Sequence, residues 1–120
     1  MNEAVISKIA DAIAFAEGFF VAGSRPHRNN NPGDLERDLT SKGRGWDGPY
    51  VIYATPQEGW EALLRQVRLM FGGSHIYKPS MTIAEVARHY TVTEPEIWAR
   101  NVAARLRVPV DTRLEDIARS

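Results

Sequence analysis

The segment from Thr55 to Gly73 constrains the fold most strongly. It opens with Thr55-Pro56-Gln57-Glu58, which has the form of a capping box with proline at the first helical position. It closes with Gly72-Gly73, and glycines at such a position end helices. The apolar residues between these signals recur at helical spacing, and they are Trp60, Leu63, Leu64, Val67, Met70 and Phe71. The segment therefore predicts a long amphipathic helix, and we expect a chain built mainly from helices.

The N-terminal segment predicts a first helix from Glu3 to Phe20. Its apolar residues also recur at helical spacing, and they are Ile6, Ile9, Ile13, Ala16 and Phe20. Gly18 and Gly23 weaken this helix and end it. The segment is thus expected to form a helix with one apolar face.

Three signals in the C-terminal half predict further helices. Segments 82–85 and 93–96 both read Thr-x-x-Glu, and we expect these capping boxes to start helices that run through Tyr90 and Leu106. Asp111 or Thr112 is expected to cap a short last helix.

Residues 23–48 are dominated by turn-forming types. We expect a small hairpin that pairs residues 34–39 with residues 46–54, because Tyr50-Val51-Ile52-Tyr53 is β-branched and aromatic. The predicted fold class is therefore α+β and predominantly α-helical, with about five helices and one small β-hairpin. Residues 1–120 are expected to form a single domain.

Composition excludes several classes of function. The chain has 15 basic and 15 acidic residues among its 120, so no overall field draws it to nucleic acid or anionic lipid. It has no cysteine, and His27, His75 and His89 are scattered without the spacing of a metal site. We therefore expect a monomer with no cofactor, no metal, no nucleic-acid partner and no membrane partner.

The chain also lacks the sequence features of a secreted or membrane-spanning protein. No signal peptide is recognised at the N-terminus, and no apolar run is long enough to cross a bilayer. We expect a protein made in the cytoplasm that reaches any external target by export, by lysis or by virion delivery.

Glu17 has an unusual position on the first helix. At about 100° per residue, it falls beside Ile6, Ile13 and Phe20, on the apolar stripe and not opposite to it. Burial raises the pKa of a carboxyl group, and a raised pKa suits a general acid near neutrality. The alternative interpretation is that Glu17 forms a salt bridge with a nearby arginine or lies at a solvated helix edge.

The loop that follows this helix is rich in side-chain amides. Segment 25–38 reads Arg-Pro-His-Arg-Asn-Asn-Asn-Pro-Gly-Asp-Leu-Glu-Arg-Asp. An asparagine side chain offers a donor and an acceptor, which match the hydroxyl and amide groups of a sugar. Trp46, Tyr50 and Tyr53 offer flat apolar faces suited to a sugar ring. The alternative is that residues 29–31 only satisfy the backbone of turns.

Three short segments carry a resemblance to a known family. They are Ala-Glu-Gly-Phe at 16–19, Arg-Asn-Asn-Asn-Pro-Gly-Asp-Leu at 28–35 and Tyr-Ala-Thr-Pro-Gln-Glu-Gly-Trp at 53–60. In this order they resemble the lysozyme-like family of muralytic proteins from phages and bacteria, and the order of elements extends the resemblance over most of the chain. The family usually has Asn after Pro-Gly, whereas this chain has Asp34.

The resemblance implies a lysozyme-like fold, with a cleft between a helical lobe and the hairpin. It also implies cleavage of the peptidoglycan glycan strand between N-acetylmuramic acid and N-acetylglucosamine, with Glu17 as the catalytic acid. We expect Asp34 to hold a water molecule as the base of a hydrolytic reaction. A lytic transglycosylase, which works with one acid, is the alternative. The substrate-binding residues expected are Asn30, Asn31, Tyr53, Thr55 and Tyr90.

Two other classes of function are alternatives. Residues 82–106 have the pattern of a helix-turn-helix, but the second helix starts at Glu94-Pro95-Glu96, which repels phosphate. A lysozyme-like module can also bind glycan or build a virion without cutting, because fold does not fix function. A pure binder, however, gains nothing from a carboxylate on an apolar face.

Overall fold

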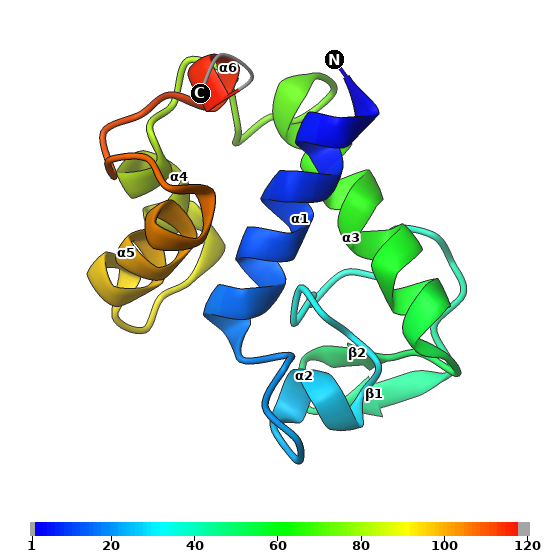
Figure 1. Cartoon of the computed structure of the whole chain (residues 1–120). Helices are drawn as coiled ribbons and strands as arrows, with labels where there is room; N and C mark the ends of the chain where they lie inside the picture. Colours follow the sequence, from blue (N-terminus) through cyan, green and yellow to red (C-terminus); the bar gives the residue numbers. More distant parts are fainter. Residues whose placement is uncertain (1, 118–120) are drawn as a thin grey trace.

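The computed structural model describes residues 2–117 and contains six helices and one two-stranded antiparallel sheet (Figure 1). The helices are α1 (Glu3–Glu17), α2 (Arg25–Arg28), α3 (Pro56–Phe71), α4 (Ile83–Tyr90), α5 (Pro95–Leu106) and α6 (Leu114–Ile117). The strands are β1 (Gly45–Asp47) and β2 (Tyr50–Ile52). In Figure 1, α1 runs between α3 on one side and the pair α4 and α5 on the other, and the hairpin lies near α2. The predicted α+β class, mostly helical, is confirmed.

The main hydrophobic core forms around α1. Its buried face packs against α3 and α5, and α4 packs against α5. Fully buried members of this core include Ile6, Ile9, Ile13, Leu63, Val67 and Met70. A second, smaller cluster joins Leu35, Val51, Tyr53 and Ala62. This cluster attaches the hairpin and the preceding loop to α3.

Helix α1 ends at Glu17, three residues earlier than Phe20. Gly18 adopts the left-handed conformation, with φ 83°, and its N–H bonds to the carbonyls of Ala14 and Phe15. Glycine takes this conformation without the steric cost that a side chain adds. The chain then turns, so that Phe19 is buried and Phe20 is half exposed. The prediction that Phe20 lies on the buried stripe is therefore wrong.

The predicted capping residues Thr55 and Thr82 both form capping bonds, whereas the box predicted at residues 93–96 does not form. The Thr55 hydroxyl accepts the N–H of Glu58 at the start of α3, and residues 82–85 form a complete capping box at α4. The predicted box at residues 93–96 is wrong, because α5 begins at Pro95. Glu94 precedes it with φ 49° and makes no capping bond through its side chain. No helix among residues 2–117 has the length and apolar character needed to cross a membrane.

The hairpin is shorter than predicted and pairs different residues. β1 and β2 are antiparallel, with Trp46 opposite Val51. Residues 34–39 do not form a strand, although the Leu35 carbonyl accepts the N–H of Val51 at 3.0 Å. Asp34 has φ 49°, a left-handed conformation that interrupts an extended strand. The segment instead forms a loop that lies against β2.

Candidate functional site

Glu17 lies at the C-terminal end of α1, where this helix meets the start of α5. Its carboxyl group is partly buried and lines a pocket of about 230 Å³, here called the Glu17 pocket. The residues that line it are Ala16, Glu17, Arg25, Thr91, Thr93, Glu94, Ile97, Trp98 and Asn101. The pocket is therefore formed by the end of α1, the start of α2, the segment that leads into α5 and the first turns of α5.

A tryptophan holds the Glu17 carboxyl group. The indole Nε1–H of Trp98 donates to Glu17 Oε2 at 2.7 Å. Trp98 is 6% exposed, and its ring stacks on Tyr90 with a centroid separation of 5.0 Å. A ring packed in this way has few alternative rotamers, so it holds the carboxyl group in a fixed orientation.

The environment of Glu17 favours its protonated form. Burial raises its pKa from 4.5 to about 7; the bond from Trp98 opposes this shift, and the negative charge of Asp34 adds to it. Within residues 2–117, no arginine, lysine or histidine forms an ion pair with Glu17. The alternative that Glu17 is a salt-bridge residue is therefore wrong. A group with this pKa can donate a proton near neutrality.

Asp34 is buried and ion-paired, not solvated. Arg25 Nε lies 3.1 Å from both Oδ1 and Oδ2 of Asp34, and Arg25 Nη2 also bonds to Oδ2. The Asp34 side chain is 4% exposed. The Arg25 guanidinium also lies over the ring of Tyr50, 3.7 Å from its centroid. Because Arg25 occupies both oxygens, Asp34 is poorly placed to hold a catalytic water, contrary to the role expected of it.

The asparagines serve the backbone of the loop. Asn31 is fully buried; its amide nitrogen donates to the carbonyls of Leu35 and Val51, and its oxygen accepts the N–H of Leu35. Asn30 donates to the carbonyl of Tyr53 at 3.0 Å. Asn31 is therefore unavailable to a sugar, and the amide nitrogen of Asn30 is engaged. For these two residues the alternative that they satisfy turn backbone is the better description.

Tyr53 and Thr55 both make contacts that support the fold. Tyr53 is 1% exposed in the smaller core cluster, and burial raises the pKa of its phenol to about 12. Thr55 is exposed, and its hydroxyl caps α3. The prediction that Tyr53 faces the cleft is wrong, because Tyr53 is buried against Val51 and Ala62.

Tyr90 does not line the Glu17 pocket, but it lies next to it through its stack on Trp98. Its hydroxyl donates to the carbonyl of Gly33 at 2.8 Å. It shares with Asp34 a second pocket of about 170 Å³, here called the Tyr90 pocket, lined also by Leu35, Glu36 and Tyr77. Arg25 connects Asp34 to the Glu17 pocket, and Trp98 connects Tyr90 to it. The two pockets are therefore neighbours, joined by an ion pair and an aromatic stack.

Sequence reasoning missed the two partners that define this geometry. Trp98 lies 81 positions from Glu17 along the chain, and nothing local to either residue indicates their contact. The pairing of Arg25 with Asp34 follows from closure of the loop between α1 and β1. Within residues 2–117, no group of three histidine or acidic side chains is arranged to hold a metal ion.

The chain matches no protein-family model, no curated protein and no solved structure.

Proposed function

We propose that the protein cleaves the glycan strand of peptidoglycan between N-acetylmuramic acid and N-acetylglucosamine, with Glu17 as the acid. The observation that carries the proposal is the state of Glu17. Its carboxyl group opens on a pocket, is held by Trp98 and has a pKa of about 7. A structural carboxylate is normally paired with a cation or fully solvated, whereas Glu17 is partly buried and forms no ion pair among the described residues.

The position of Glu17 in the chain also supports this activity. It closes the first helix, directly before the loop of asparagines and the hairpin. This is the order in which the segments resemble the lysozyme-like muralytic family. The resemblance supplies the substrate class, and the geometry of Glu17 supplies the role of proton donor.

Pairing of Asp34 with Arg25 favours a reaction with one acid. In such a reaction Glu17 gives its proton to the glycosidic oxygen, and the bond from this oxygen to the anomeric carbon of the muramic residue breaks. The 6-hydroxyl of the same sugar then attacks the anomeric carbon and returns its proton to the Glu17 carboxylate. The products are a 1,6-anhydromuramic end and a free N-acetylglucosamine end, and Glu17 is protonated again.

Hydrolysis needs a second group to activate water. With inversion, the two carboxyl groups flank a water and lie about 6.5–9.5 Å apart. Asp34 can serve only if Arg25 releases it, and the bidentate bond holds it instead. The single-acid route requires no such rearrangement, so we favour it over the hydrolytic route that the sequence suggested.

Analysis of the products by mass spectrometry tests both the function and the route. Purified sacculi are digested with the wild-type protein and with Asp34→Asn. We expect 1,6-anhydromuramic ends from both proteins. Reducing muramic ends from the wild type that disappear with Asp34→Asn would instead establish hydrolysis with Asp34 as the base. Absence of any cleaved glycan would refute the proposed function.

A further inference from the structure

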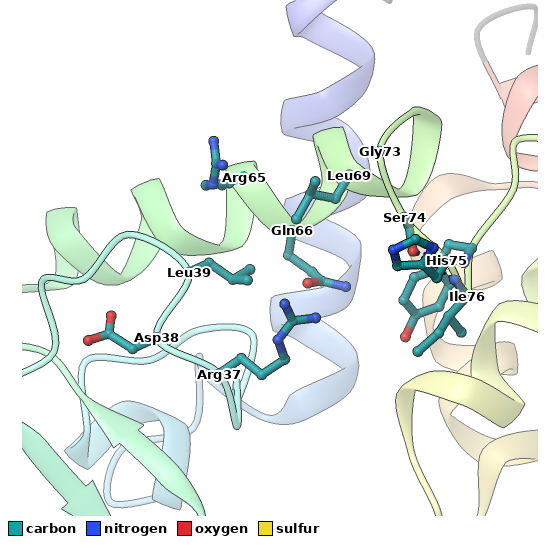
Figure 2. A pocket seen from close by; sticks show the side chains of 11 residues that line it. Arg37, Asp38, Leu39, Arg65, Gln66, Leu69, Gly73, Ser74, His75 and Ile76 are labelled. Atoms are coloured by element: carbon teal, nitrogen blue, oxygen red, sulfur yellow. Dashed lines mark hydrogen bonds between the residues drawn. The ribbon is translucent and has the colours of Figure 1, made fainter.

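A further pocket lies beyond the Tyr90 pocket and does not include Glu17. It has a volume of about 470 Å³ and is here called the Arg37 pocket. It is formed by residues 37–39, the outer face of α3 from Arg65 to Leu69, and residues 73–77. Figure 2 shows Gln66 and Arg37 directed toward the same space from α3 and from the loop, with Ser74, His75 and Ile76 on the other side.

This pocket adjoins the Tyr90 pocket. It shares Arg37, Gln66, Ile76 and Tyr77 with the Tyr90 pocket. The Tyr90 pocket is joined in turn to the Glu17 pocket through Arg25 and Trp98. The Glu17 pocket and the Arg37 pocket thus both lie next to residues that border the Tyr90 pocket.

The Arg37 pocket carries uncompensated positive charge. Arg37 and Arg65 are exposed, and neither forms an ion pair with any residue in 2–117. The one carboxylate in the lining is Asp38, and it is turned inward. Its Oδ2 accepts the N–H of Gly43 at 3.0 Å, and its Oδ1 is buried. An anionic ligand therefore meets the free guanidinium group of Arg37 (Figure 2), which can bind a carboxylate through paired hydrogen bonds.

The rest of the lining suits a peptide. Gln66 is partly buried and offers an amide that can pair with a peptide group. Ile76 is half exposed, and Leu39 and Leu69 also contribute apolar surface. A pocket of this size that combines charged, amide and apolar groups accommodates a short segment of chain better than a single ion.

We propose that the Arg37 pocket binds the peptide stem of the substrate, with Arg37 on a stem carboxylate and Gln66 on a stem amide. The inference rests on the proposed function, because peptidoglycan carries its peptides as branches on the muramic residue next to the bond that Glu17 attacks. The protein then acts preferentially on glycan strands that still carry anionic peptides.

Cleavage of three substrates tests this preference. They are intact sacculi, the same glycan after an amidase has removed the stems, and sacculi whose stem carboxyl groups have been converted to amides. The wild-type protein is expected to cleave intact sacculi about tenfold faster than either of the others, the effect of one charge-assisted contact. Equal rates on all three would overturn the inference and leave the proposed function intact.

The variant Arg37→Glu tests whether Arg37 recognises the peptide stem. This variant is expected to lose the preference for intact over stem-free glycan. The matched control is Arg44→Glu, because Arg44 is also exposed and without an ion pair but does not line the pocket. If Arg37→Glu keeps the wild-type ratio of rates, or if Arg44→Glu loses it equally, Arg37 does not recognise the stem.

Binding of the free stem gives a result that does not depend on cleavage. The stem peptide released by the amidase is titrated into the protein and followed by heteronuclear NMR. At about 5 mM peptide, above the millimolar dissociation constant of a weak contact, backbone signals of residues 65–69 and 73–77 are expected to shift. Arg37→Glu is expected to abolish the shifts. Absence of shifts there in the wild type would overturn the inference even if sacculi are cleaved.

Discussion

Replacement of Glu17 by glutamine is expected to make stability less dependent on pH. The unfolded chain ionises this carboxyl group near its ordinary pKa of 4.5, whereas the folded protein keeps the proton to about pH 7. As the pH rises between these values, the unfolded state binds fewer protons than the folded state, so the free energy of unfolding falls. Glutamine has no proton to lose and keeps an oxygen that can accept the bond from Trp98.

The size of this effect follows from the pKa of Glu17. The pKa rises from 4.5 to about 7, a difference of about 2.5, and each pKa unit corresponds to ~1.4 kcal/mol. Ionisation of Glu17 therefore lowers the free energy of unfolding of the wild type by about 3 kcal/mol above neutrality. The stability of Glu17→Gln relative to wild type should increase by this amount between about pH 4 and about pH 8.

Urea denaturation of both proteins at the two pH values measures the difference, because titration of the other groups cancels between them. Glu96→Gln, which removes an exposed carboxylate from α5, controls for the loss of one negative charge. A relative stability of Glu17→Gln that stays constant between the two pH values would refute the raised pKa of Glu17 and its assignment as a protonated acid.

Three further substitutions test the supports of the site. Trp98→Phe removes the bond that favours the charged form of Glu17, so the alkaline limit of activity should move to higher pH in a pH–rate profile. Asn31→Ala leaves buried backbone groups of the loop without their side-chain partner, and denaturation should record a loss of about 2–4 kcal/mol. Gly59→Ala places a Cβ 1.8 Å from the carbonyl oxygen of Asn30, so it should lower the melting temperature strongly. At Gly45, where a Cβ meets nothing within 4 Å, alanine should have little effect.

Local signals in the sequence predict the helices well, because they act between neighbours along the chain. The stop at Gly72 and the capping bonds at Thr55 and Thr82 all join residues within one or two turns. The start of α5 could not be predicted in this way. Its cap depends on the left-handed backbone at Glu94, which the pattern of residue types does not reveal.

The site is less predictable because its contacts are distant in sequence. The helical period places Glu17 correctly at a partly buried position, but it gives no indication of Trp98 on α5. Strand alternation puts Val51 and Tyr53 on the same face, and only the packing against Ala62 decides that this face is the buried one. The partner of Asp34 is set by the path of the loop, which no periodic pattern describes.

Release of soluble glycan fragments from purified sacculi tests the central claim most directly. Wild type, Glu17→Gln and the control Glu96→Gln are compared near pH 6, where the Glu17 carboxyl group is mostly protonated given its pKa of about 7. Removal of a general acid typically lowers the rate by about 10²–10⁴-fold. We expect release by the wild type and by Glu96→Gln, and a loss of this size in Glu17→Gln. Release by Glu17→Gln at a rate close to that of the wild type would contradict the account.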